Sequence, residues 1–255
     1  MDSENVVKSV DRALQIVKLI SANKNMGVTE IAHEIDINKS AVYRILSTLV
    51  KHGFIEKNPE TNRYQLGYTF LGIASNLLES IDLRTEAQPF LKELEALTNE
   101  VIHLVVYDQG EVVYIEKLEG NETLRMHSQV GRRAPMHCTG VGKAILAYLP
   151  RQMVSNILDQ KGMPAHTAKT ITEKEAFFRE LEKVKHQGFA LDLEENEQGI
   201  TCIAAPIFNH QKEIAAAISI SGPTLRMTDQ RLEQLKEKIT AVGREISQRL
   251  GCPSP

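Results

Sequence analysis

Residues 38–53 read NKSAVYRILSTLVKHG, and this stretch decides the fold of the N-terminal part of the chain. Asn38 is a favoured helix N-cap and Gly53 a favoured helix terminator, so the stretch predicts a helix over Lys39–His52. Because a helix turns about 100° per residue, one side of it carries aliphatic side chains that can pack on a core. These are Val42, Ile45, Leu46 and Leu49.

The opposite side of this predicted helix carries hydroxyls, a phenol and cations. The major groove of DNA admits one helix and offers acceptors to such donors. We therefore expect Ser40, Tyr43 and Arg44 to contact base edges or nearby phosphates. The residues expected to contact backbone phosphates are Lys39, Lys51, Lys57 and Arg63. Since any surface helix exposes polar side chains, this interpretation depends on the elements around the helix.

Those neighbouring elements predict a DNA-binding fold. They are helices at residues 10–21 and 28–35, a turn at 36–38, and strands at 54–57 and 63–66. In the first helix, apolar residues recur at helical spacing, at Val10, Leu14, Val17 and Ile20. The order helix, helix, turn, helix and hairpin predicts a winged helix-turn-helix domain over residues 1–67.

A linker helix is predicted over residues 68–82. Its apolar stripe comprises Phe70, Ile73, Ala74, Leu77, Leu78 and Ile81. A helix without a core of its own needs a partner for such a stripe, which favours a dimer.

The remaining residues, 83–255, predict an α+β domain built on an antiparallel sheet. The expected helices span residues 89–98, 139–149, 153–159, 174–187 and 229–250. The expected strands span residues 101–107, 111–118, 124–130, 189–193, 201–208 and 213–221. A three-residue loop at 108–110 should join the first two strands.

Composition restricts the class of protein. Lys and Arg outnumber Asp and Glu over residues 6–68, whereas the acidic residues prevail over 69–255. This asymmetry favours an anionic partner for the N-terminal part. The N-terminus lacks the basic start and apolar stretch of a signal peptide, and no apolar run is long enough to span a membrane, so we expect a cytoplasmic protein without a membrane partner. Three cysteines are too few and too scattered for a disulfide framework or a Cys-rich zinc site.

Residues 131–147, GRRAPMHCTGVGKAILA, are a candidate ligand-binding segment. Thr139 can cap a helix that begins Gly140-Val141-Gly142, and the free amides and small side chains of its first turn suit an anion. The same residues can equally be an ordinary glycine-containing helix start.

The last two predicted strands offer a second indication of a cavity. If residues 209–212 form a four-residue hairpin loop, Cys202 lies opposite Ser219. Side-chain alternation then separates a small face from a bulky face. The small face comprises Cys202, Ala204, Ala215, Ala217, Ser219 and Ser221, and the bulky face Ile203, Ile207, Ile214, Ile218 and Ile220. A small, weakly polar face can leave room for a ligand. Asp192 can accept a hydrogen bond from such a ligand or be a solvated acid at a strand end.

Together these segments resemble the IclR family of bacterial transcriptional regulators, from about Val6 to Leu250. The most family-like stretch is Gly131–Ala147, followed by Glu197-x-Gly199-Ile-x-Cys202-x-Ala-Ala-Pro206 and Ser219-x-Ser221-Gly-Pro. Ser40-x-Val-x-Arg44-x-Leu is also similar to the family pattern. Cys138 departs from it, because many relatives carry Ser or Ala at this position.

The resemblance implies a GAF-like effector domain, a homodimer or dimer of dimers, and binding to a palindromic DNA operator. It also implies control by a small anionic metabolite, such as an organic acid or sugar acid. The implied effector contacts are His137, Cys138, Gly140, Val141, Asp192, Cys202, Ser219 and Ser221. The function expected from it is that of a transcriptional regulator, a repressor of a catabolic operon.

Three other functions can be written from the same residues. An enzyme could use His137, Cys202 and Asp192 as base, nucleophile and orienting residue. A metal sensor could use the same three with Cys138, although no short ligand spacing supports it. The C-terminal part could also serve assembly alone. The regulator interpretation predicts no enzyme activity, no cofactor and no metal.

Overall fold

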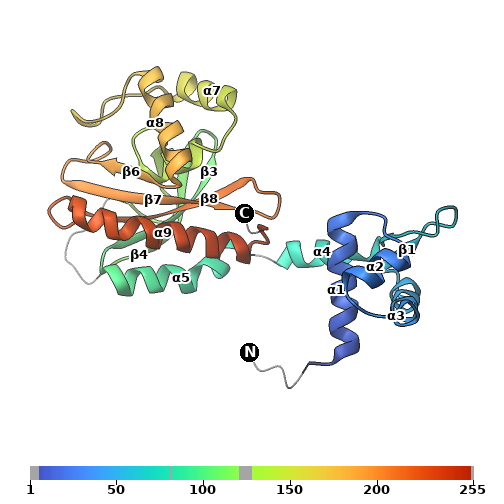
Figure 1. The fold of residues 1–255 in the computed structure, drawn as a ribbon. Helices are drawn as coiled ribbons and strands as arrows, with labels where there is room; N and C mark the ends of the chain where they lie inside the picture. Colours follow the sequence, from blue (N-terminus) through green and yellow to red (C-terminus); the bar gives the residue numbers. More distant parts are fainter. Residues whose placement is uncertain (1–5, 81, 121–127, 254–255) are drawn as a thin grey trace. The chain divides into compact units, whose positions relative to one another are not determined.

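The structure, a computed structural model, describes residues 6–80, 82–120 and 128–253 (Figure 1). The chain divides into two compact units, Met1–Ile81 and Asp82–Pro255. The helix expected as a separate linker, α4 (Thr69–Ser80), belongs to the first of these units. Each unit has its own core.

The N-terminal unit is a winged helix-turn-helix, as predicted. Its further elements are α1 (Lys8–Asn23), α2 (Val28–Glu34), α3 (Lys39–Lys51), β1 (Ile55–Lys57) and β2 (Tyr64–Leu66). The Asn38 side chain accepts a hydrogen bond from the Ala41 amide at 2.8 Å, so it caps α3. β1 and β2 pair in antiparallel register and form the wing.

A small apolar core holds this unit together. Its buried members are Ile16, Ile20, Met26, Ile31, Ala32, Val42, Leu46, Ile55 and Tyr64. The packing face predicted for α3 is therefore confirmed. The face predicted for α1 is wrong in part, because Val10 and Leu14 are 55% and 57% exposed while Ile16 is buried. Two apolar stripes overlap on this helix, and its packing against α3 and β2 selects the one that contains Ile16 and Ile20.

The C-terminal unit is a six-stranded antiparallel sheet between two layers of helices (Figure 1). Its strands, in the order β5-β4-β3-β8-β7-β6, are Arg133–Pro135, Glu111–Leu118, Val101–Asp108, Ile214–Pro223, Ile200–Phe208 and Ala190–Leu193. Its helices α5 to α9 are Leu83–Thr98, Gly140–Leu146, Arg151–Lys161, Lys174–Gln187 and Asp229–Arg249. The predicted α+β class with an antiparallel sheet is confirmed.

The helices cover the sheet on both faces. α5 and α9 lie along one face, and α7 and α8 lie on the other (Figure 1). A close approach fixes α9, because a Cβ at Gly243 would lie 2.8 Å from the carbonyl oxygen of Pro206. On the opposite face α6, α7 and α8 share one core cluster with Val105, Ala204 and Ala217 of the sheet.

The register of β7 and β8 differs from the one assumed from the sequence. Cys202 lies opposite Ser221, and Ala204 lies opposite Ser219. The predicted loop was one residue too short, and an irregularity between Ile207 and Phe208 adds a second residue to the shift. Because the total shift is two residues, the small side chains stay on one face. The prediction for Ile214 is wrong, since it packs with Ala204 and Ala217 on the opposite face.

Residues 124–127 of the strand expected at 124–130 lie outside the described residues, and residues 128–130 are not in a strand. β4 pairs with β5 as well as with β3. One further prediction needs correction. The loop at 108–110 is shorter than expected, because Asp108 pairs with Glu111 and leaves a two-residue turn. Gln109 and Gly110 both have positive φ, of 49° and 81°, as such a tight hairpin turn requires. Over the part of the chain with a described structure, no helix is long and apolar enough to cross a membrane.

Candidate DNA-binding face and ligand cavity

The side of α3 turned away from the core is exposed along its length. Its exposed polar residues are Lys39, Ser40, Tyr43, Arg44, Ser47 and Lys51. Tyr43 is 56% exposed, which is unusual for a large aromatic side chain without a partner surface. The Ser40 hydroxyl donates to the Asn38 side chain at 2.8 Å, so Ser40 also stabilises the helix start.

Two cations of the wing were predicted to contact DNA. One is exposed, and the other binds residues of the same unit. Lys57 is exposed at the end of β1, with its Nζ 5.9 Å from the centroid of the Tyr64 ring. Arg63 instead donates to Glu30 Oε2 at 2.7 Å and to the Asn25 carbonyl at 2.8 Å. Arg63 therefore ties the wing to the start of α2, a structural role that the sequence did not indicate.

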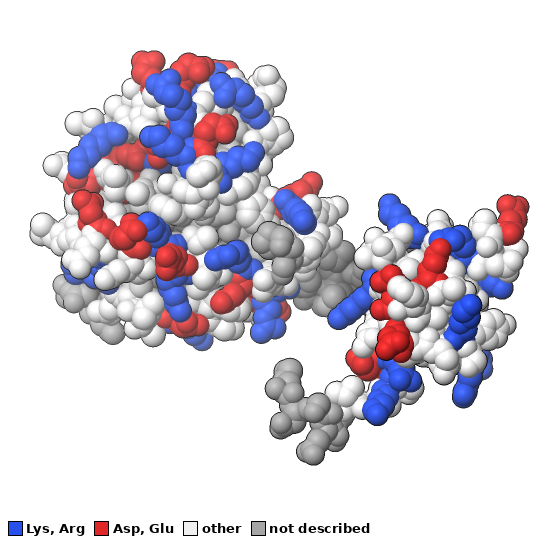
Figure 2. All heavy atoms as spheres, in the orientation of Figure 1, with Lys and Arg blue, Asp and Glu red and all other residues white. Residues whose placement is uncertain are grey.

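Charge is distributed without large single-sign areas on the visible face of the C-terminal unit. Figure 2 shows positive and negative side chains interspersed there. The DNA-contact prediction therefore depends on the local face of α3 and not on a strongly basic body.

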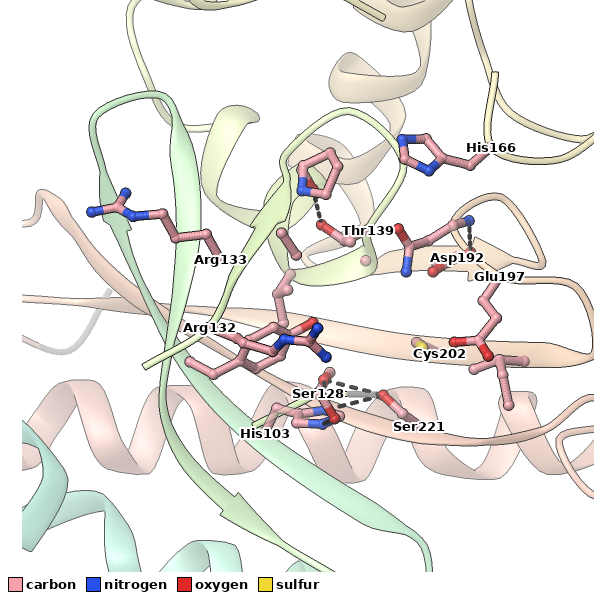
Figure 3. Close-up of a pocket in the computed structure, with 18 residues that line it drawn as sticks. His103, Ser128, Arg132, Arg133, Thr139, His166, Asp192, Glu197, Cys202 and Ser221 are labelled. Atoms are coloured by element: carbon pink, nitrogen blue, oxygen red, sulfur yellow. Dashed lines mark hydrogen bonds between the residues drawn. The ribbon is translucent and has the colours of Figure 1, made fainter. Parts of the chain in front are cut away.

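A cavity of about 470 Å³ lies in the C-terminal unit, between the small-residue face of the sheet and the start of α6. Six of the predicted effector residues line it, namely Gly140, Val141, Asp192, Cys202, Ser219 and Ser221. The cavity is polar, with hydroxyl, imidazole, guanidinium and carboxyl groups in its wall (Figure 3). Its size suits a small organic molecule.

His137 and Cys138 do not belong to the wall of this cavity. Cys138 is fully buried, and its thiol donates to the Asn196 side chain at 3.4 Å. The His137 ring is hydrogen-bonded to the Pro164 carbonyl and lines a separate hollow of about 100 Å³. The loop before α6 turns these two side chains away from the cavity that its neighbour Thr139 lines.

Pairing of β3 with β8 builds one end of the cavity. His103 lies opposite Ser219 in this pair, and its Nε2 is 2.8 Å from the Ser128 hydroxyl (Figure 3). Its Nδ1 is 3.3 Å from the Ser221 hydroxyl. Burial, together with the charge of Lys117, lowers the pKa of His103 to about 3, so the ring is neutral near pH 7. A neutral imidazole and hydroxyls can each donate or accept a hydrogen bond.

Asp192 of β6 defines the other end. It lies opposite Cys202, and its Oδ1 accepts hydrogen bonds from the amides of Glu195 at 2.7 Å and Asn196 at 3.3 Å. Burial outweighs these hydrogen bonds and raises the pKa of Asp192 to about 7. Both protonation states are therefore populated near neutral pH. The prediction that Asp192 is a site residue is favoured over a solvated strand-end acid, because its side chain is buried.

The first turn of α6 lies between the His103 and Asp192 ends of the cavity, and its residues are buried. Thr139 Oγ1 accepts from the Gly142 amide at 3.2 Å, as the predicted cap. A Cβ at Gly140 would lie 3.4 Å from the Ala204 Cβ, so α6 begins directly on the small face of the sheet. This helix therefore covers Ala204, whereas Cys202, Ser219 and Ser221 remain in the cavity wall. Lys143, a buried residue of the same helix, forms an ion pair with Glu195.

Several residues of the wall were not among the predicted contacts. Arg132, Arg133, Ala134, Pro135 and Thr139 lie in the predicted ligand-binding segment 131–147 without having been named as contacts. The others are His103, Tyr114, Ser128, His166, Asn196, Glu197 and Ile200. A β3–β8 pairing would have placed His103 beside the serines, but nothing local to the sequence specifies that pairing. Arg133 forms an ion pair with Asp108, so it is partly neutralised.

The geometry contradicts the arrangement that an enzyme interpretation required. Cys202 and Asp192 line the cavity, but His137 does not. The residue that would act as base is therefore not in the cavity that holds the residue that would act as nucleophile. Burial also raises the pKa of Cys202, which keeps its thiol protonated near neutral pH. A protonated thiol is a poor nucleophile.

A winged helix-turn-helix followed by a domain with a polar cavity is the plan of a ligand-responsive DNA-binding regulator. Comparison with known proteins assigns the family. The sequence model of the IclR helix-turn-helix domain matches residues 9–59, and that of the C-terminal domain of the bacterial transcriptional regulator IclR matches residues 75–248.

Individual relatives are similar in sequence over almost the whole length of this chain. The chain is 36% identical over 250 residues to the HTH-type transcriptional regulator XynR of Escherichia coli (strain K12), covering 98% of this chain and 99% of that one. It is 35% identical over 245 residues to KdgR of the same organism, covering 96% and 93%. The crystal structure of Thermotoga maritima IclR matches with a TM-score of 0.65 at 33% identity, covering 96% and 99%. The chain belongs to the IclR family and is a DNA-binding transcriptional regulator, not an enzyme.

Proposed function

We propose that the chain binds a palindromic operator as a homodimer or a dimer of dimers. A helix-turn-helix dimer places two recognition helices in major grooves about one helical turn apart, roughly 34–36 Å. The observation that carries this proposal is the exposed face of α3, where Tyr43 and Arg44 project away from the core. Tyr43, Arg44 and Ser40 would contact base edges or nearby phosphates.

Three exposed cations of the predicted set would contact phosphates, namely Lys39 and Lys51 on α3 and Lys57 in the wing. Such contacts position the protein on the duplex without reading its sequence. We leave Arg63 out of this set, because its guanidinium is engaged with Glu30 and Asn25.

Exposed apolar side chains of the N-terminal unit support a dimer. Val10 and Leu14 on α1 are more than half exposed, and Leu71 and Ile73 on α4 are 66% and 49% exposed. Apolar surface of this kind is stabilised when a second copy covers it. A symmetric dimer then matches the two-fold symmetry of a palindromic site.

The proposed effector is a small anionic metabolite, an organic acid or sugar acid, bound in the cavity of about 470 Å³. Its contacts would include Gly140, Val141, Asp192, Cys202, Ser219 and Ser221. Arg132 in the wall favours a carboxylate, while the serine and histidine groups suit hydroxyls or a carbonyl. Metabolites of this class are products of catabolic routes, so we propose that the regulated genes form a catabolic operon.

The effector can control DNA binding only if the protein has two conformations that differ in affinity for DNA, and if the effector binds one of them more tightly. A coupling free energy of about 1–3 kcal/mol, typical of such systems, changes operator affinity by about 5- to 150-fold. We propose repression, because a dimer seated on promoter DNA sterically excludes other proteins from it.

The test is a fluorescence-anisotropy titration of the full chain on its own promoter region, with a panel of small organic and sugar acids. We expect tight binding to that duplex and a shift of affinity with one class of acid. Promoter binding that no acid changes, together with no acid that raises the melting temperature, would favour a domain that serves assembly alone.

A further inference from the structure

Three side chains with metal-binding atoms meet beside the cavity. They are His137, Cys138 and His166, and the candidate ligand atoms of all three lie within 4.8 Å of one another. The first two belong to the loop before α6, and His166 belongs to the α7–α8 connection, residues 162–173. The metal interpretation considered from the sequence lacked His166, because only the fold brings it to the other two.

We propose that this His–Cys–His group binds one divalent transition metal ion of the zinc type. Imidazole nitrogen and thiolate sulfur are the donors that Zn²⁺ prefers, with bonds of about 2.0–2.3 Å. Ligands at those bond lengths around a tetrahedral ion lie somewhat closer together than 4.8 Å. His166 is exposed and can close this small difference, whereas Cys138 is fixed in the interior.

The hydrogen bond of His137 prepares its ring for a metal. Its Nε2 lies 3.0 Å from the Pro164 carbonyl oxygen. Because a carbonyl can only accept, the proton is on Nε2, and Nδ1 keeps its lone pair. A metal-binding histidine commonly donates its second N–H to a backbone carbonyl in this way. The His137 and His166 ring centroids are 5.9 Å apart, which allows both rings to reach one ion.

Hydrogen bonds hold the His166 backbone at this position. The His166 amide donates to Thr170 Oγ1 at 3.0 Å, and Thr170 Oγ1 donates to the Glu195 carbonyl at 2.6 Å. Thr167 Oγ1 also donates to the Glu194 carbonyl at 2.7 Å. The third ligand is thus carried by a segment that is anchored to the end of β6. A bound ion would join this segment to the loop before α6.

Three protein ligands leave a fourth coordination position. His166 also lines the ligand cavity, together with Asp192, Asn196 and Glu197. An oxygen donor in the cavity, water or a small molecule, could complete the coordination. The inference goes beyond the proposed DNA and effector functions and does not depend on them.

Cobalt(II) binding tests the proposal without DNA or effector. The full chain, treated with a chelator and then dialysed, is titrated with Co²⁺ and subsequently with Zn²⁺. We expect one ion per chain, a thiolate-to-cobalt charge-transfer band with four-coordinate visible bands, and loss of both when Zn²⁺ displaces Co²⁺. Absence of the charge-transfer band would overturn the proposal.

Variants locate the ion. His166→Ala should fold as the parent does, because His166 is exposed, and should weaken Co²⁺ affinity by at least about tenfold. Cys138→Ser should remove the charge-transfer band. The matched controls, His186→Ala and Cys252→Ser, should leave both unchanged. A band that survives Cys138→Ser, or an affinity unchanged in His166→Ala, would place the ion elsewhere and refute the assignment.

Discussion

His103 and Ser219 face each other across the β3–β8 pair, and 3.3 Å separates His103 Nδ1 from Ser219 Oγ. The ring is buried, so its protonation would leave a charge inside the protein without a carboxylate beside it in the contacts that the structure shows. The pKa of His103 falls to about 3 for this reason, from an ordinary value of 6.5.

The first prediction concerns stability in acid. Since the pKa of His103 is lower in the folded than in the unfolded state, its contribution is complete above pH 6.5 and is lost as the pH falls toward 3. Between pH 7 and pH 5 this amounts to about 2 kcal/mol. His103→Gln should therefore remove a pH-dependent loss of about that size, measured by urea unfolding at both pH values.

The pH dependence of stability must be compared between parent and variant, because Asp192 changes stability with pH in the opposite direction to His103. The raised pKa of Asp192 adds stability as the pH falls below 7. The exposed His186→Gln serves as control and should retain the parent's pH dependence. If His103→Gln also retains it, the histidine is not buried as a neutral ring.

The second prediction concerns the pH dependence of effector binding. A protonated Asp192 can donate a hydrogen bond to an anionic ligand, whereas the carboxylate repels it. With a pKa of about 7, the protonated fraction falls by about tenfold between pH 6 and pH 8, and affinity should fall similarly. Calorimetry with the most strongly stabilising acid would show this slope. Asp192→Asn should flatten it, and an unaltered slope would assign the effect to another group.

The third prediction separates the two cations of the wing. Lys57→Ala should leave the melting temperature unchanged and reduce the salt dependence of DNA binding by about 0.9 in log–log slope, as one lost phosphate contact does. Arg63→Ala should instead lower the stability of the N-terminal unit, by up to about 1 kcal/mol, because its partly exposed ion pair is lost. Salt titrations and thermal melts measure the two effects. A reduced salt dependence in Arg63→Ala without a loss of stability would show that Arg63 contacts DNA.

The fourth prediction concerns the serines of β8. Replacing Ser219 and Ser221 together by Ala should weaken effector binding by about thirtyfold, since each of the two lost hydrogen bonds contributes about 1 kcal/mol. Operator affinity without effector should be unchanged. Ser155→Ala in α7 is a control outside the cavity wall. Reduced operator affinity in the double variant would show that the serines are structural.

Much of the fold follows from local patterns. Asn38 and Gly53 delimit α3, and the helix and hairpin order around them specifies the winged helix-turn-helix. The α1 face could not be chosen, because its two apolar stripes differ only in what the rest of the fold covers. Ile16 and Ile20 are selected by packing that no local pattern contains.

The residues of the cavity also divide into those that a local sequence pattern predicts and those that it does not. Gly140, Cys202 and the two serines were accessible to sequence reasoning, because a capped glycine helix and a strand of alternating small residues are local signals. The shift of the β7–β8 register by an even number of residues left that result intact. His103 and His166 were not accessible, since each reaches the site through contacts between segments far apart in the chain.

The most direct test of the account is the effect of Arg44→Ala on binding to the chain's own promoter duplex. It is measured by fluorescence anisotropy at moderate salt against a scrambled duplex of equal length. We expect the parent and Arg179→Ala, an exposed control on α8, to prefer the promoter duplex. Arg44→Ala should lose about 1–3 kcal/mol of that binding while folding normally. Equal affinity of parent and Arg44→Ala, or a parent that does not distinguish the duplexes, would contradict the assignment of α3 as the recognition helix.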